Sequence, residues 1–281
     1  MKKMILALFA ISSLAHANNK AIYGVDSRID VEQSPNPIHK ELAKSVAAMV
    51  PNYVINPNPS VFMDFFDITL QDSSSVCSNE RFAHQQTVSV CTAFLVAPNV
   101  LATAGHCVRT VEDCENNKWV FDYKLENEED SFVVNIPRSS VYSCKKVLDT
   151  KLTIFTKKDW ALIELDRPVT DRAPLKLNKA SPNKGDDVFV IGTPSGLPLK
   201  VASGSVRANK MNYFRTNLDT YAGNSGSPVF NKQNEVIGVL VRGDNDYDES
   251  VRGCNMSSRY GDSTGRGEDV SYVKDIIKAL K

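Results

Sequence analysis

The stretch YAGNSGSPVF, residues 221–230, places a serine inside a run of small residues just before an apolar, strand-like segment. A serine in this setting is either a nucleophile or part of a tight turn between two strands. Because glycine accepts backbone angles that other residues avoid, Gly223 and Ser225 can present their backbone N–H groups together. Attack on an acyl carbon needs such donors, an alcohol, a base and a group that orients the base. Ser225 is therefore a candidate nucleophile if the rest of the chain supplies the base.

Two further segments supply a candidate base and its partner. LATAGHC places His106 after an apolar strand, and KDWALIEL places Asp159 at the start of another. A lone histidine is more often a hydrogen-bonded core residue, and a lone strand-end aspartate is more often structural. Asp166 and Asp171 are rivals of Asp159, but both follow its strand into a Pro-containing turn. A shielded carboxylate can fix the tautomer of an imidazole, so His106, Asp159 and Ser225 together predict nucleophilic catalysis.

Most of the chain from residue 77 onward has the pattern of short strands and turns. The runs are rich in Val, Ile and aromatic residues and are bounded by Gly, Pro, Asn or Asp; they are VSVCTAFLVAP, VLATAGHCV, WVFDYKL, SFVVNI, WALIEL, DVFVIG, VASGSVRA and EVIGVLV. Many short strands at fairly regular spacing predict an all-β sandwich or barrels.

Two segments are predicted to be helical. IHKELAKSVAAMV, residues 38–50, predicts one short helix that ends before Pro51. At the end of the chain, VSYVKDIIKALK predicts a helix whose apolar face carries Val273, Ile276, Ile277 and Leu280.

The N-terminus predicts export. Lys2 and Lys3 precede an apolar core, and Ala15-His16-Ala17 gives a small-x-small cleavage site, so residues 1–17 are predicted to be a signal peptide. No later stretch is long and apolar enough to predict a membrane span. We expect a secreted or periplasmic protein.

Residues 18–76 are polar and proline-containing and are predicted to be an N-terminal arm or a removable pro-segment, with the domain proper at residues 77–281.

Composition narrows the function classes. Lys+Arg and Asp+Glu both number 33, and no basic run is interleaved with aromatics, so the molecule as a whole is not predicted to bind nucleic acid or an anionic membrane. The six cysteines are even in number and none form a CxxC pair, which in an exported chain indicates disulfides. Three histidines remain after the signal (His39, His84 and His106), and their positions predict no ligand cluster and no metal site.

The segments TAGHC, DWALI and GNSGSP resemble the three signature segments of chymotrypsin-like serine proteases. The bacterial branch typified by V8 glutamyl endopeptidase is especially similar, because it shares GNSGSPVFN followed by EVIG. The resemblance implies two six-stranded antiparallel β-barrels with a C-terminal helix and the site between the barrels. It also implies a secreted serine endopeptidase with the triad His106, Asp159 and Ser225, and an oxyanion hole formed by the N–H groups of Gly223 and Ser225. Protein or peptide substrates, no cofactor and a monomer are expected.

The resemblance also implies one disulfide and one difference in activation. Cys91 and Cys107 match the pair that bridges the histidine loop in many animal-type members. The other four cysteines leave three pairings open, of which we favour Cys114–Cys144 with Cys77–Cys254. Animal-type members have an aspartate before the nucleophile that pairs with a new N-terminus on activation. Here that residue is Asn224, which carries no charge, so this ion-pair switch is not expected.

Substrate preference is left open by the residues that match the substrate pocket. Asp219, six residues before Ser225, matches the base of the pocket in enzymes that select Arg or Lys, although it can equally bond inward to structure. Thr220 matches a threonine of the V8 branch, which selects glutamate, but Leu240 stands where that branch has a histidine. Arg242 carries a positive charge that could serve the pocket or neutralise Asp219. Basic, acidic and apolar preferences therefore remain alternatives.

Two other classes of protein compete with this interpretation. A catalytically inactive homologue acting as a binding module usually lacks the serine or the histidine, and this chain keeps both. An α/β-hydrolase needs G-x-S-x-G followed by a helix and a later histidine. Here Ser227 occupies the fifth position, Pro228 opposes a helix, and no histidine follows Ser225. The esterase alternative is therefore excluded.

Overall fold

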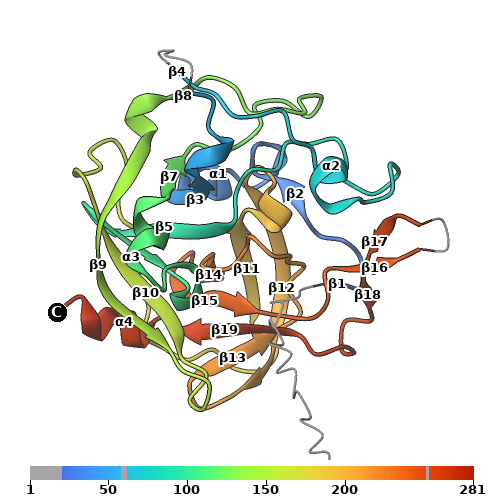
Figure 1. Cartoon of the computed structure of the whole chain (residues 1–281). Coiled ribbons are helices and arrows are strands. Elements are labelled where there is room, and N and C mark those ends of the chain that lie inside the picture. Colours follow the sequence, from blue (N-terminus) through green and yellow to red (C-terminus); the bar gives the residue numbers. More distant parts are fainter. Residues whose placement is uncertain (1–20, 58–61, 251–252) are drawn as a thin grey trace, which may run out of the picture.

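The computed structural model describes residues 21–57, 62–250 and 253–281, so the predicted signal peptide lies outside the described residues. Figure 1 shows strands arranged around two centres with short helices at the periphery. The helices are α1 (Pro37–Ala43), α2 (Leu70–Ser74), α3 (Val111–Glu115) and α4 (Lys274–Ala279). None of the helices in the described ranges is long and apolar enough to cross a membrane.

Six antiparallel strands form the first closed barrel. In spatial order they are β10 (Asp159–Leu165), β6 (Val100–Thr103), β5 (Cys91–Ala97), β3 (Val46–Pro51), β7 (Asn117–Phe121) and β9 (Val141–Leu152). The ring closes because β9 pairs with both β7 and β10. Bulky residues such as Phe94 and Trp119 fill the interior, and both are almost fully buried.

The second barrel is built in the same way from the C-terminal half. Its order is β11 (Asp187–Gly192), β14 (Pro228–Asn231), β15 (Val236–Arg242), β19 (Glu268–Tyr272), β13 (Tyr213–Thr216) and β12 (Lys200–Asn209). A pairing of β11 with β12 closes the ring, and β2 (Ile29–Asp30) adds to β12. The fold predicted from the resemblance, two six-stranded antiparallel barrels with a C-terminal helix, is confirmed.

Short paired segments decorate the barrels. They are β1 (Ile22–Tyr23) with β18 (Arg259–Tyr260), β4 (Phe62–Met63) with β8 (Ile136–Pro137), and β16 (Tyr247–Glu249) with β17 (Asn255–Ser257). The run SFVVNI, which has the pattern of a strand, contributes only the start of β8 and no barrel strand.

The predicted helix at residues 38–50 is wrong in its second half. The helix α1 ends at Ala43, and β3 follows as a barrel strand between β5 and β7. All six residues of β3 are buried, because the strand lies in a barrel wall with packed material on both faces. The barrel domain therefore begins inside residues 18–76, and the predicted boundary at residue 76 does not coincide with the edge of the barrel.

The C-terminal helix is also shorter than predicted. The part VSY belongs to β19, which closes the second barrel, and α4 begins only at Lys274. Its apolar face is as expected: Val273 and Ile276 are fully buried, while Ile277 and Leu280 pack against the core from its edge. The need for a sixth barrel strand thus overrides the helical periodicity of the first residues.

Three disulfides tie the elements together, and they are the pairs favoured from the sequence. Cys91–Cys107 joins the start of β5 to the turn after β6, and Cys114–Cys144 joins α3 to β9. Cys77–Cys254 connects positions 177 residues apart in the chain. The described residues include no free cysteine.

Candidate active site

His106 and Asp159 lie in direct contact in the first barrel. His106 is in a short 3-10 turn, Gly105–Cys107, after β6, and Asp159 is the first residue of the neighbouring strand β10. The Nδ1 atom of His106 is 2.9 Å from Oδ2 of Asp159, and the His106 backbone N–H donates to Oδ1 over 3.1 Å. Both carboxylate oxygens therefore hold the same histidine, one through its ring and one through its backbone.

The environment of Asp159 keeps it ionised. Burial alone would raise its pKa, since the residue is only 3% exposed, but the bonds from His106 and the Arg242 guanidinium lower the pKa below its usual value. An ionised Asp159 can only accept hydrogen bonds, so the ring proton of His106 resides on Nδ1. The other ring nitrogen, Nε2, is then available as a proton acceptor.

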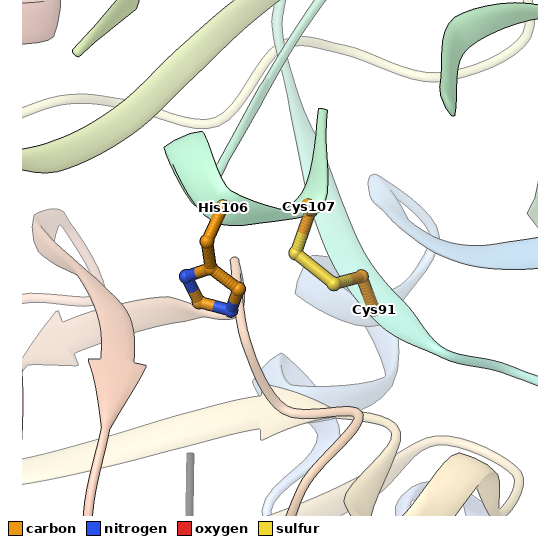
Figure 2. Close-up of side chains that lie close together, drawn as sticks. All are labelled: Cys91, His106 and Cys107. Atoms are coloured by element: carbon orange, nitrogen blue, oxygen red, sulfur yellow. A yellow bond between two sulfur atoms is a disulfide. The ribbon is translucent and has the colours of Figure 1, made fainter. Parts of the chain in front are cut away.

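The turn that carries His106 is fixed by its neighbours. Figure 2 shows the Cys91–Cys107 disulfide beside the imidazole. Because the two sulfur atoms are bonded to each other, neither is a thiolate that could ligate a metal with His106. A Cβ on Gly105 would overlap the backbone oxygen of Lys151, so the turn packs closely against β9.

The Ser225 loop lies against this turn from the second barrel. The carbonyl of Ser225 accepts a hydrogen bond from the Thr92 N–H over 2.8 Å and lies 3.7 Å from the sulfur of Cys107. Ser225 itself is 3% exposed. The structure thus brings the predicted nucleophile next to the residue that follows His106 in the chain.

Two glycines allow the Ser225 loop to fold tightly. Gly223 has φ +91° and Gly226 has φ +92°, which is the left-handed region that side chains disfavour. A Cβ at Gly226 would overlap the carbonyl of Thr92 and the hydroxyl of Thr103. The two barrels therefore pack closely against each other where the serine is held.

A hydrogen bond fixes the orientation of the peptide unit that joins Ala222 to Gly223. The Ala222 carbonyl, in the same peptide unit, accepts from the Ser195 N–H over 2.5 Å. The C=O and N–H of a trans peptide point in opposite directions, so the Gly223 N–H points away from Ser195. Within the described part of the chain it meets no acceptor. The Gly223 carbonyl is turned between the barrels, where it accepts from Thr92 and Thr193.

Asn224 stays within its own loop. Its backbone N–H donates to the Tyr221 carbonyl over 3.0 Å, and its Oδ1 accepts from the Ser227 hydroxyl over 3.3 Å. These are neutral bonds inside a buried turn. An aspartate at this position would carry a charge and would need an ionic partner, whereas Asn224 does not.

Asp219 faces the N-terminal segment. Its Oδ1 accepts from the Tyr23 N–H, and its Oδ2 accepts from both the N–H and the hydroxyl of Ser27, each over 2.7 Å. Burial raises the pKa of Asp219 despite these bonds. No local sequence pattern predicts these particular partners, because the contacts join residues almost 200 positions apart.

Thr220 is hydrogen-bonded to Glu268, an acidic residue that was not predicted from the sequence. Its hydroxyl donates to Oε2 of Glu268 over 2.7 Å. Oε1 of Glu268 accepts from the Tyr23 hydroxyl over 3.1 Å and lies 3.4 Å from the Asp244 backbone nitrogen. Glu268 is fully buried on β19, between the segment of Thr220 and the segment that follows β15.

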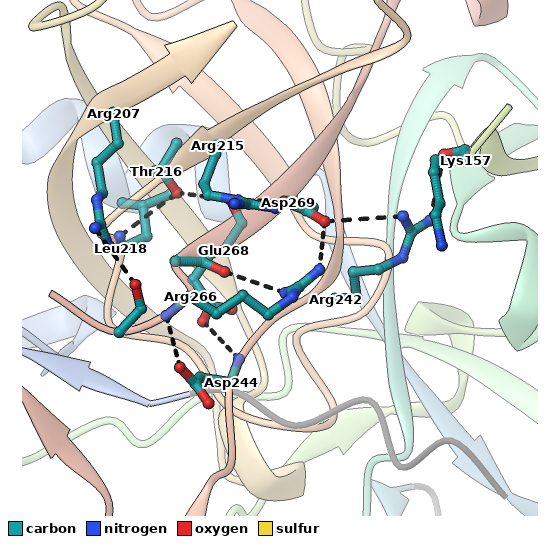
Figure 3. A network of polar contacts seen from close by, with 12 residues as sticks. Lys157, Arg207, Arg215, Thr216, Leu218, Arg242, Asp244, Arg266, Glu268 and Asp269 are labelled. Carbon is teal, nitrogen blue, oxygen red and sulfur yellow. Dashed lines mark hydrogen bonds and ion pairs between the residues drawn. The ribbon is translucent and has the colours of Figure 1, made fainter. Parts of the chain in front are cut away.

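The other two residues matched to the pocket, Leu240 and Arg242, both lie on β15. Leu240 is fully buried in the second barrel. Arg242 lies 3.5 Å from Oδ2 of Asp159 and 3.9 Å from Oδ2 of Asp269, and it makes no contact with Asp219 in the ranges that the structure describes. Figure 3 shows its side chain reaching from Asp269 to Lys157. Arg242 thus belongs to the surroundings of the His–Asp pair.

Known proteins support the same fold and family. A family model described as a trypsin-like peptidase domain matches residues 91–239. A glutamyl endopeptidase of Staphylococcus epidermidis is 43% identical over 72 residues, which is 24% of this chain and 25% of that protein. A probable periplasmic serine endoprotease, DegP-like, of Hahella chejuensis is 34% identical over 92 residues, covering 30% of this chain and 19% of that protein.

The structural likeness is wider than the sequence likeness. A solved Glu endopeptidase in complex with MPD superposes with a TM-score of 0.53 over 92% of this chain and 97% of that chain, at 16% identity. At this identity the likeness shows the fold. The chain spans between about a fifth and a quarter of the length of these curated relatives, whereas the family model covers just over half of the chain. The chain belongs to the trypsin-like peptidase family.

Proposed function

We propose that the protein is an exported serine endopeptidase that hydrolyses peptide bonds through Ser225, His106 and Asp159. The observation that carries the proposal is the His106–Asp159 pair, with Nδ1 and Oδ2 2.9 Å apart, beside the Ser225 loop. Family membership and the names of the relatives support the same activity. Export rests on the predicted signal peptide.

The reaction assigns one task to each group. Nε2 of His106 takes the proton of the Ser225 hydroxyl as Oγ attacks the substrate carbonyl, and the N–H groups of Gly223 and Ser225 stabilise the oxyanion. His106 then gives its proton to the departing amine, which leaves an acyl-enzyme on Ser225. Water, activated by His106, releases the acid. Asp159 keeps its charge throughout and stabilises the imidazolium.

Hydrolysis of a protein substrate such as casein tests the proposal. We expect activity in the purified chain, and losses of about 10³-fold or more in kcat for Ser225→Ala and for His106→Ala. An inactive wild-type protein with a correctly folded site would instead favour the binding-module alternative. Full activity in purified Ser225→Ala would refute the triad.

We further propose that the enzyme cleaves after basic rather than acidic residues. Two carboxylates, Asp219 and Glu268, are buried around Thr220, and Leu240 replaces the histidine of the glutamate-selecting branch. An acidic substrate side chain would be repelled there, whereas a lysine or arginine would be attracted. A cleavage profile on a peptide library measures this directly. We expect Glu268→Gln to weaken the preference, and cleavage mainly after glutamate would contradict it.

We propose that residues from Ala21 onward stay with the mature enzyme as an arm. Ala21, Ile22 and Tyr23 are buried, and β1 pairs in parallel with β18. If the segment from Ala21 to Ser27 were removed, the Asp219 carboxylate would stay buried without its hydrogen bonds from Tyr23 and Ser27. N-terminal sequencing of the exported protein should find a start before Ala21, and a start beyond Ser27 would contradict the arm.

A further inference from the structure

Two hairpin tips from different barrels place large apolar side chains together in solvent. The β9–β10 turn presents Ile154 and Phe155, which are 81% and 99% exposed, and the β12–β13 turn presents Met211, which is 87% exposed. The Asn212 side chain of the second turn donates to the Thr156 carbonyl of the first over 2.8 Å, so the tips are neighbours. Figure 1 shows the long β9–β10 hairpin extending to the same end of the molecule as β13. We call Ile154, Phe155 and Met211 the apolar tip.

The exposure of the apolar tip is built into an ordered turn. The Thr153 N–H donates to the Lys158 carbonyl over 2.9 Å, the Lys158 N–H donates to the Thr153 hydroxyl, and the hydroxyls of Thr153 and Thr156 are bonded. Arg242 donates to the Lys157 carbonyl over 3.3 Å from the other barrel. The turn is therefore anchored at several points, and its two largest apolar side chains are held outward.

Lysines surround the apolar tip. Lys151, Lys157 and Lys210 are all exposed and lie within three residues of one of its members. Lys151 pairs with Asp149 over 2.9 Å and Lys158 pairs with Asp275 over 2.9 Å. In the described ranges Lys157 and Lys210 pair with no acid, so the tip carries a local positive excess in a chain with no formal net charge.

From this arrangement we infer that the apolar tip docks the enzyme on an anionic lipid surface. Apolar side chains beside lysines are the combination that binds peripheral proteins to such membranes, because the apolar groups enter the interface and the lysines attract the headgroups. Three protruding side chains supply too little area for a stable protein interface, which buries about 800 Å² per partner. A bilayer, which deforms around a convex tip, needs no matching hollow. The formal net charge of the whole chain is zero, so it does not reveal the local excess of positive charge around the apolar tip.

Docking would also place the candidate active site near the membrane. Asp159 follows Lys157 by two residues, and Arg242 contacts both the Lys157 carbonyl and Asp159. Substrates at the membrane surface would then be favoured. The docking itself does not depend on peptidase activity, so Ser225→Ala is a suitable background in which to measure it.

Co-sedimentation of the whole exported chain with lipid vesicles tests the inference. We expect binding to vesicles of equal parts phosphatidylcholine and phosphatidylglycerol, and at least about tenfold weaker binding to phosphatidylcholine alone. The triple variant Ile154→Ser, Phe155→Ser, Met211→Ser should lose about tenfold or more in partitioning. Lys157→Gln with Lys210→Gln should reduce the preference for the anionic vesicles.

A matched control separates the apolar tip from exposed apolar residues in general. Tyr53 is 76% exposed elsewhere on the surface, and Tyr53→Ser should bind vesicles as the wild type does. All the substituted side chains are exposed, so thermal unfolding should be nearly unchanged in every variant. Equal partitioning of the wild type and the triple variant would overturn the inference. So would self-association that the triple variant abolishes without any vesicle binding, because the tip would then be a protein interface.

Discussion

The Arg242 guanidinium lies 3.5 Å from Oδ2 of Asp159, the same oxygen that contacts Nδ1 of His106. The lowered pKa of Asp159 means that the folded state gains stability when this carboxyl is ionised, above the pH of about 4 at which it titrates in the unfolded chain. That stability is lost as the pH falls through the lower, folded-state pKa. We expect Arg242→Gln to reduce the free energy of unfolding by about 1 kcal/mol at pH 7, and by less as the pH falls below about 4.

A double-mutant experiment measures the Arg242–Asp159 interaction separately from the other contacts of Arg242. In an Asp159→Asn background the carboxylate is absent, so Arg242→Gln should have a smaller and nearly pH-independent effect on urea unfolding. An equal effect of Arg242→Gln in both backgrounds would show that its contact with Asp269 accounts for the stability instead.

Asp159 itself should matter to catalysis far more than to folding. With Asn in its place, the ring proton of His106 is no longer held on Nδ1 by a carboxylate, and Nε2 is a poorer base. We expect Asp159→Asn to lower kcat by about 10⁴-fold with a smaller change in KM, measured on a peptide ester. A loss below about tenfold would mean that another group orients His106.

The residues of the candidate site were predictable where chemistry is local in sequence. The segments TAGHC, DWALI and GNSGSP predict the roles of His106, Asp159 and Ser225. The structure places His106 and Asp159 in contact. The partners of Asp219 and Arg242 were not predictable. Tyr23 and Ser27 reach Asp219 only through the folded arm, and Arg242 reaches Asp159 only because β15 and β10 belong to barrels that pack together. Such contacts depend on tertiary packing and leave no pattern along the chain.

Among the elements, the Ser225 loop offers a direct test of close packing. Gly226 and Gly185 share a left-handed backbone, with φ +92° and +90°, but a Cβ at Gly185 would meet nothing within 4 Å. Gly185→Ala should cost about 1–2 kcal/mol of stability, which is the price of the backbone angle alone. Gly226→Ala should cost at least about 2 kcal/mol more, because its Cβ overlaps Thr92 and Thr103. Equal losses in chemical denaturation would contradict the close approach.

The disulfides should separate stability from activity. In the loop-entropy model, Cys77–Cys254, with a sequence separation of 177, contributes about 5 kcal/mol, and Cys91–Cys107, with a separation of 16, contributes about 3 kcal/mol. We expect the paired Ser substitutions at 77 and 254 to lower the free energy of unfolding more. Those at 91 and 107 should lower kcat more, because they free the His106 turn. The reverse order in both measurements would contradict these roles.

Element boundaries were less predictable than element types. The alternating and apolar runs predict most of the barrel strands, such as DVFVIG in β11. In contrast, residues 38–50 and the end of the chain were each predicted as one helix, and each contains a helix and a strand. In both places a barrel needed a sixth strand. Pairing with two neighbours stabilises an extended conformation over a weak helical pattern, and a single sequence does not show which neighbours are present.

At the scale of the molecule, the two barrels each supply half of the proposed chemistry. The first holds the base and its orienting acid, and the second holds the nucleophile and Gly223, while Thr92 bonds across to the Ser225 loop. Hydrophobic residues of both barrels form one continuous core. The alignment of the site therefore depends on the packing of two halves that the chain builds one after the other.

Reaction with an organophosphonate that mimics the tetrahedral intermediate tests the proposed triad most directly. Mass spectrometry of the treated protein should find one phosphonate adduct, on the peptide that contains Ser225, and His106→Ala should slow its formation by at least about 10³-fold. The apolar tip variant should react as the wild type does. An unmodified Ser225 in folded protein, or an adduct that forms equally fast in His106→Ala, would contradict the account.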